Sequence, residues 1–173
     1  AVLYQMNSVN ESSEKEIVIS CEQAVHNSLS EPFTYTLSEE KNAVCQLADR
    51  VETYLYEPGA ALLKAGPYRL LSQRYGVKKL HPNSHLYTSS VQVDFPGRCF
   101  QVTGISGFGK KEVKELLGGL EKANLTVRNF PASVADLRKK LKLKEGGDVY
   151  LFATTLQNGE KVLIKCLKPA LLS

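Results

Sequence analysis

The strongest constraint on the fold is the order of predicted elements in residues 98–173. Four segments of this region are rich in β-branched and aromatic residues, and two segments between them place apolar residues at helical spacing. A β-α-β-α-β-β order in so short a region predicts a split βαβ arrangement, with both helices on one face of a mixed sheet. The predicted strands are 99–105, 125–130, 148–155 and 161–167, and the predicted helices follow Gly109 and Ser133.

The N-terminal residues carry weaker strand patterns. Short apolar or alternating runs at 1–6, 17–20 and 32–37 predict the strands of a small antiparallel sheet. The stretch 8–16 is polar and predicts a connector. Because residue 1 already falls within a strand-like run, we expect the chain to be a piece of a longer protein.

Two helices are predicted between these strands and residue 98. Apolar residues at helical spacing from Ser38 to Leu55 predict the first helix, and the sequence EPG at 57–59 predicts its end. The second is predicted over 60–76, interrupted where glycine meets proline. Residues 78–98 are expected to be rich in turns, with an extended segment only at 85–89. The whole is predicted to be an α+β protein in two parts, residues 1–97 and residues 98–173.

Charge divides the chain in the same way. Residues 98–173 hold 14 Lys and Arg against 7 Asp and Glu, whereas residues 1–97 hold 8 against 11. A basic region in a chain whose formal net charge is only +4 indicates a polyanionic partner, although a solvated basic face gives the same count. Charge alone leaves both interpretations open.

The stretch GISGFGKKE, residues 104–112, joins a predicted strand to a predicted helix. Its spacing imitates a nucleotide-binding P-loop, but Lys111 stands where a magnesium-binding hydroxyl belongs, and the glycine order reverses the dinucleotide fingerprint. A sharp turn alone would explain the glycines. Lys110 and Lys111, however, oppose the helix dipole by roughly 0.3 to 1 kcal/mol each, a cost that a nucleic-acid phosphate would offset. The stretch is therefore either a structural turn or a phosphate seat.

A second basic cluster, RKKLKLK, occupies residues 138–144. Leu137 and Leu141 are expected to face inward, which leaves the cations outward or flanking. Cations near the end of a helix suit its dipole, so a solvated face explains this cluster unless other cations of the same region act with it. The candidate RNA-binding residues are Lys110, Lys111, Lys114, Arg128, Arg138, Lys139, Lys140 and Lys142.

No recognisable catalytic, cofactor or metal signature is present. The four cysteines are far apart, which predicts free thiols, and His81 and His85 flank a proline without a cluster of further ligands. Glu57 and these two histidines have no role that the sequence assigns. No apolar stretch reaches the length of a membrane span and no signal peptide is visible, so we expect a soluble, cytoplasmic protein without a membrane partner.

Three longer phrases carry a family resemblance: YLYEPGAALLKAG at 54–66, KKLHPNSHLYTS at 78–89 and VRNFPASVADLRKKLKLKEGGDVYLFATT at 127–155. They resemble the C-terminal part of a family of class I S-adenosylmethionine-dependent methyltransferase-like proteins. In that family a ferredoxin-like segment is followed by a THUMP-like domain. The resemblance extends from about Tyr54 to Lys168, and residues 1–53 match less clearly.

The resemblance implies a catalytic domain upstream of Ala1, with S-adenosylmethionine as the cofactor of the parent protein and none in this chain. THUMP domains are associated with RNA-modifying enzymes, so the expected partners are RNA and the upstream methyltransferase domain. We expect a noncatalytic portion that captures substrate RNA. The alternative is a structural module that packs on the methyltransferase domain without binding RNA.

Overall fold

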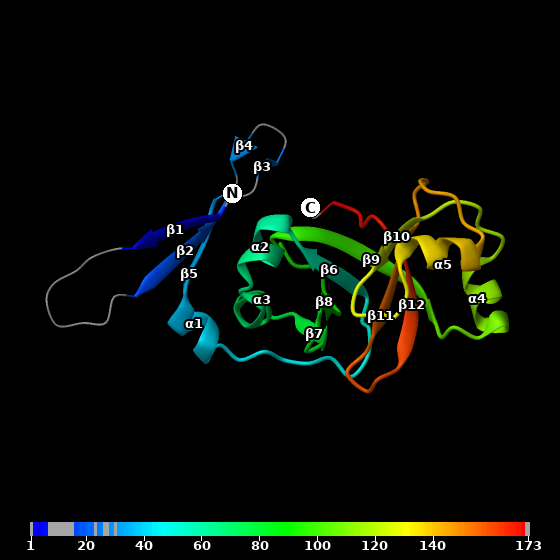
Figure 1. Ribbon diagram of the computed structural model, residues 1–173, viewed down its shortest axis with the longest axis horizontal. Helices are drawn as coiled ribbons and strands as arrows, with labels where there is room; N and C mark the ends of the chain where they lie inside the picture. The colour runs from blue at the N-terminus through cyan, green and yellow to red at the C-terminus, as the bar shows by residue number, and fades with distance from the viewer. Residues whose placement is uncertain (1, 7–15, 23, 26–27, 30, 172–173) are drawn as a thin grey trace, which may run out of the picture.

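The computed structural model describes residues 2–6, 16–22, 24–25, 28–29 and 31–171. The predicted polar connector lies, apart from Glu16, outside these residues. Three N-terminal strands form the predicted antiparallel sheet, in the order β1-β2-β5, and two short strands form a separate pair (Figure 1). The strands are β1 (Val2–Met6), β2 (Ile17–Cys21), β3 (Ala24–Val25), β4 (Ser28–Leu29) and β5 (Phe33–Thr36).

The main sheet has seven strands in the order β10-β11-β12-β9-β6-β8-β7. Neighbouring strands are antiparallel except for β10 and β11, so the predicted mixed sheet is confirmed. The sheet runs across the predicted boundary at 97/98, because the whole of β6 pairs with the first half of β9. Its strands are β6 (Tyr54–Pro58), β7 (Lys78–His81), β8 (Ser84–Ser89), β9 (Gly97–Ser106), β10 (Asn124–Val127), β11 (Tyr150–Thr155) and β12 (Lys161–Leu167).

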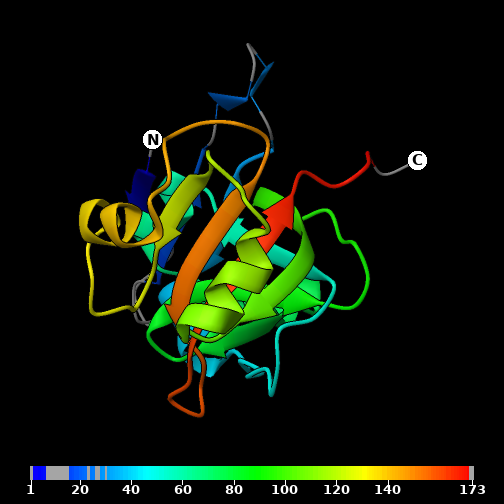
Figure 2. The same cartoon turned by 90° about the vertical axis from the view of Figure 1, so that its right-hand side faces the viewer.

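Two pairs of helices cover different parts of this sheet (Figures 1 and 2). Leu116 and Leu137, from the last two helices, join Leu151 and Leu163 of the sheet in one apolar cluster, so both helices lie on one face as predicted. Leu62 and Leu71 pack against Tyr56 and Tyr87 at the other end of the sheet. The helices are α1 (Leu37–Asn42), α2 (Ala60–Ala65), α3 (Tyr68–Tyr75), α4 (Lys110–Leu117) and α5 (Val134–Leu141).

A third apolar cluster joins the two ends of the sheet. Leu55 and Leu86, from β6 and β8, are fully buried together with Phe152 and Ile164, from β11 and β12. The side chains of Ser84 and Thr154 form a buried 2.9 Å hydrogen bond in the same region. The sheet is therefore curled, so that the inner faces of its two ends share one core.

The helix predicted from Ser38 to Leu55 is wrong beyond residue 42. Thr36 caps α1 by accepting a hydrogen bond from the Glu39 N–H, and Ala43 is already extended (φ −65°, ψ 145°). The apolar residues that suggested a continuous helix do not share a buried face, because Val44 is 66% exposed whereas Leu55 is inaccessible. The helical spacing of these apolar residues is therefore a coincidence and does not mark one buried helix face.

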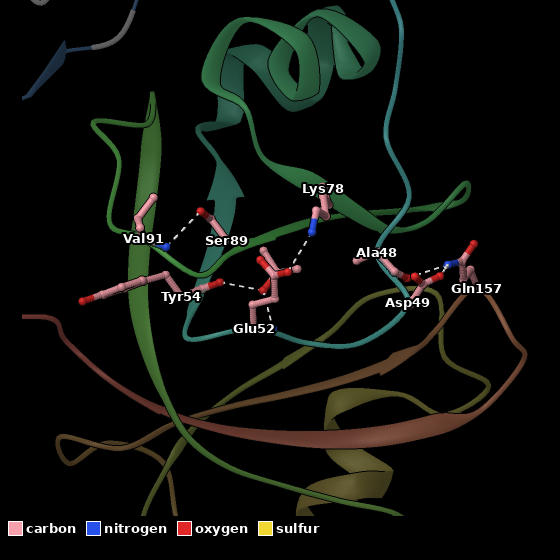
Figure 3. A network of polar contacts seen from close by, with 9 residues as sticks. Ala48, Asp49, Glu52, Tyr54, Lys78, Ser89, Val91 and Gln157 are labelled. Atoms are coloured by element: carbon pink, nitrogen blue, oxygen red, sulfur yellow. Dashed lines mark hydrogen bonds and ion pairs between the residues drawn. The ribbon is translucent and has the colours of Figure 1, made fainter.

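Side chains and strands elsewhere in the fold fix the extended segment 43–53 (Figure 3). The Glu52 N–H donates to Thr88 Oγ1 at 2.7 Å, and the Glu52 carboxylate accepts from Lys78 Nζ at 2.8 Å. Gln157, in the turn between β11 and β12, donates to the Ala48 carbonyl at 2.7 Å. These partners satisfy polar groups that a helix would otherwise have paired internally.

Two further predictions for this part need correction. The sequence EPG does not end a helix, since Glu57 and Pro58 complete strand β6. The turn-rich region contains a second strand, β7, which pairs with β8 as a hairpin. The interruption of the second helix is confirmed: Gly66 adopts φ +84° between α2 and α3. Among the described residues, none of the helices is long and apolar enough to cross a membrane.

Candidate nucleic-acid interface

Helix α4 begins at Lys110, as predicted from the glycine-rich turn. A Cβ at Gly104 would lie 2.7 Å from Leu116 Cδ1, so this glycine allows the helix to approach its strand. At Gly109 a Cβ would lie 2.6 Å from Glu112 Oε2, which accepts a hydrogen bond from the Gly109 N–H at 3.2 Å. A carboxylate of the helix itself therefore lies at the predicted phosphate seat and supplies the negative charge that the dipole favours there.

Helix α5 begins and ends with recognisable caps. Ser133 Oγ accepts from the Asp136 N–H at 3.1 Å, which agrees with the prediction that this helix follows Ser133. Lys142 ends the helix in the left-handed conformation (φ 56°), and its N–H donates to the last carbonyls of the helix.

A groove of about 480 Å³ lies between α4 and α5. Its apolar lining includes Phe108, Val113, Leu117, Leu120 and Leu141, and four predicted cations surround it: Lys110, Lys114, Lys140 and Lys142. The spacing of four residues between Lys110 and Lys114 places both on the same face of α4. All four lysines are exposed, and Lys140 Nζ lies 6.0 Å from the centre of the Phe108 ring.

The four groove lysines lack acidic partners. Within the part of the chain that the structure describes, none of them forms an ion pair within 4.0 Å. Four like charges around one hollow repel each other, and an anion in the groove would relieve that repulsion. The arrangement combines an apolar floor with a cationic rim, which suits a nucleotide whose base has an aromatic face that can stack and whose phosphate is negative.

Three other predicted cations lie outside the groove. Arg138 donates to the Ala123 carbonyl at 3.2 Å, so its side chain ties α5 to the start of β10. Lys111 lies 4.0 Å from Glu115 in an exposed pair along α4. Lys139 is exposed and does not line the groove.

Arg128 is separate from all of these lysines. It follows β10, and its Nη2 lies 3.3 Å from Glu57 Oε2 on β6. Glu57 Oε1 in turn accepts from Arg98 Nη2 at 2.7 Å. The Glu57 carboxylate, only 7% exposed, therefore joins the two ends of the curled sheet through two arginines.

The two histidines without a sequence-assigned role are linked to the segment around Arg128, His81 through Asn129 and His85 through the charge of Arg128. His81 Nδ1 accepts from the Asn83 N–H at 2.9 Å and lies 3.1 Å from the Asn129 amide nitrogen. His85 stacks on the Tyr68 ring with 3.5 Å between the ring centres. Burial, and then the positive charges of Lys79 and Arg128, lower the pKa of His85 to about 4.

Sequence reasoning missed Arg98 and the groove lining. Arg98 opposes Glu57 because β6 and β9 are antiparallel, a register that no local pattern announces. Phe108, within the glycine-rich stretch, contacts Phe130, with 4.8 Å between ring centres, and also lines the groove. The described residues hold no group of three or more His, Cys, Asp or Glu side chains placed to bind a metal.

Comparison with known families gives two matches that together cover residues 54–168. Residues 54–96 match a family model described as a ferredoxin-like domain, and residues 97–168 match one described as THUMP domain-like. The junction between the two matches falls at the start of β9, inside the seven-stranded sheet.

One solved structure is similar over most of the chain. It is titled "Crystal structure of putative methyltransferase from Porphyromonas gingivalis W83", with 38% sequence identity and a TM-score of 0.80. The similarity covers 87% of this chain and 38% of that protein, so the chain spans well under half of its relative. Curated proteins gave no match.

Proposed function

We propose that this chain is an RNA-binding portion of a methyltransferase-family protein, because residues 54–96 match the ferredoxin-like domain model and residues 97–168 match the THUMP domain-like model. The resemblance read from the sequence is confirmed at the level of these two domains and of a methyltransferase-titled structural relative. In the proposal, this portion holds substrate RNA for a catalytic domain elsewhere in the parent protein, which uses S-adenosylmethionine.

The observation that carries the proposal is the lysine-rimmed groove. Lys110, Lys114, Lys140 and Lys142 surround it without acidic partners among the described residues. Lys and Arg contacts with phosphates release counterions from the nucleic acid, which drives sequence-independent binding. The groove offers few base-edge donors or acceptors, so affinity is expected to come from phosphate contacts and from stacking on Phe108 rather than from sequence readout.

The test is a fluorescence-anisotropy titration with a short hairpin RNA transcript, repeated from low to physiological salt. Wild type should bind weakly, with an affinity that falls steeply as salt rises. Lys110→Glu with Lys114→Glu should weaken binding by at least about tenfold at low salt, because both phosphate contacts become repulsive.

The matched control is Lys64→Glu with Lys161→Glu, two exposed lysines away from the groove that give the same change in net charge. This control should lose only a small part of the affinity. Wild type without salt-dependent binding, or equal losses in both double variants, would count against the groove. Binding to the methyltransferase domain alone, without RNA, would then support the packing module instead.

A further inference from the structure

A second group of cations is built around Glu57, away from the lysine-rimmed groove. Glu57 is buried on β6, and its two carboxylate oxygens face Arg98 at 2.7 Å and Arg128 at 3.3 Å. The carboxylate holds both guanidinium groups from the protein side. Arg128 Nη1 also donates to the Val127 carbonyl at 3.3 Å. Because a planar guanidinium has five N–H donors, each arginine still keeps several donors unused.

The unused donors are open to solvent. The Arg98 side chain is 52% exposed and that of Arg128 is 40% exposed, although the carboxylate between them is buried. Arg98 also lies over the Phe100 ring at 5.1 Å. On this side it lines a hollow of about 630 Å³ with Lys168 and Asp94, which Arg128 does not line. The arginines are therefore fixed on their inner sides and available on their outer sides.

Positive charge exceeds negative charge in this neighbourhood. Glu57 balances only one of its two arginines. Lys79 is buried, donates to the Pro82 carbonyl and lies 5.2 Å from the Tyr68 ring centre, and its charge acts on His85 together with that of Arg128. In the described ranges Lys79 has no carboxylate within 4.0 Å. The neutral His85 between these groups adds no charge to either side, since burial and the two cations lower its pKa.

We propose that Arg98 and Arg128, positioned by Glu57, form a binding site for one phosphate group. The two Nη2 atoms contact the two oxygens of one carboxylate, at 2.7 Å and 3.3 Å, which brings them close enough for the oxygens of one phosphate to reach both at ordinary hydrogen-bond lengths. One phosphodiester carries a single negative charge, which matches the surplus that two arginines leave on one carboxylate. Glu57 acts as a positioning residue, and the arginines contact the ligand.

The phosphate can belong to RNA or to a free phosphate ester, and the chemistry of the site is the same for both. As an RNA contact, the site extends the proposed function to a second face of the chain. As a site for a free ester, it stands whether or not the lysine-rimmed groove binds RNA. The probes below separate these sources.

The experiment follows the side-chain Nε–H signals of arginine by nuclear magnetic resonance during titration. Inorganic phosphate, adenosine 5′-monophosphate and a single-stranded oligouridylate are added in separate series. The signals of Arg98 and Arg128 should shift together and saturably with each probe, while the signal of Arg74 should not. Arg74 is the matched internal control, because it pairs at 3.5 Å with Glu39, a carboxylate that is itself exposed.

Variants complete the test. Arg128→Lys keeps the charge but loses the guanidinium fork, and it should weaken phosphate binding by about fivefold or more, whereas Arg74→Lys should leave it unchanged. Tighter binding of the oligouridylate than of the monophosphate assigns the site to RNA, and the reverse assigns it to a free ester. Equal, unsaturable shifts at all three arginines, or no shift at Arg98 and Arg128, overturn the site. Because these readouts do not involve Lys110 or Lys114, they remain informative if the groove fails its own test.

Discussion

The role of several single residues in this fold depends on contacts with residues that are remote in sequence. Glu57 forms ion pairs with Arg98 and Arg128, which lie 41 and 71 positions further along the chain. A glutamate followed by a proline gives no local signal that predicts either ion pair. The lysines were easier to select from the sequence, because a basic helix end is a local pattern. Their division into groove residues and others depended on the relative placement of α4 and α5, which local pattern does not specify.

His85 leads to a prediction at this scale. Its folded pKa of about 4 lies below the usual 6.5, so between these values the unfolded state binds a proton that the folded state does not. Stability should therefore be constant with respect to this group above about pH 6.5 and should fall as the pH drops toward 4. Urea unfolding at pH 7 and at pH 5 measures the difference.

His85→Phe keeps a ring to stack on Tyr68 and removes the titration. Its loss of stability between pH 7 and pH 5 should be smaller than that of wild type. His81→Gln serves as the control, because it removes a histidine that contacts Asn83 and Asn129 and leaves the ring stacked on Tyr68 in place, and it should behave as wild type does. An unchanged pH dependence in His85→Phe would assign the effect to other groups.

At the scale of elements, the pairing of β6 with β9 joins the two segments that match different family models. Gly97 allows the two strands to approach each other this closely. A Cβ at this position would lie 2.1 Å from the Glu57 carbonyl oxygen and 2.9 Å from the Gly59 nitrogen, both backbone atoms that cannot move aside singly. Gly97→Ala should therefore destabilise the protein by about 3 kcal/mol or more, or prevent folding.

The comparison variant is Gly119→Ala. Nothing lies within 4 Å of a Cβ there, and only its backbone angle (φ +83°) is unfavourable, which costs about 1 to 2 kcal/mol. Urea denaturation followed by circular dichroism measures both variants, and soluble yield reports on Gly97→Ala if it does not fold. Similar losses in the two variants would show that crowding at Gly97 is relieved by small shifts.

Elements with strong local signals were predicted well, and those that depend on tertiary partners were not. The strands and helices of 98–173 have regular apolar periods and caps, and the structure confirms their order. The helix predicted for segment 43–53 is wrong because polar groups of this segment are paired with Thr88, Lys78 and Gln157, from elements far along the chain. The sequence did not predict strand β7, because a lysine-rich run is typical of an exposed turn, whereas Lys79 is buried.

At the scale of the whole molecule, the chain is expected to lack cofactor chemistry of its own. The glycine-rich turn is occupied by the Glu112 carboxylate, and Arg128 stands where a ribose-binding acidic residue would follow. We therefore predict that isothermal titration calorimetry of this chain with S-adenosylmethionine shows no saturable heat of binding. The same titration of a full-length methyltransferase of this family is the positive control, and one-to-one micromolar binding to the chain alone would contradict the prediction.

The curled sheet has a consequence for how such a protein can be rearranged. The junction of the two family matches passes between hydrogen-bonded strands and through a shared apolar core, so neither half is a separable cassette. A recombination event or a cloning boundary at residue 97 would expose the β6 and β9 edges together with the side chains of Leu55, Leu86 and Phe152. We therefore expect the two matched segments to be inherited together, even though a separate family model matches each of them.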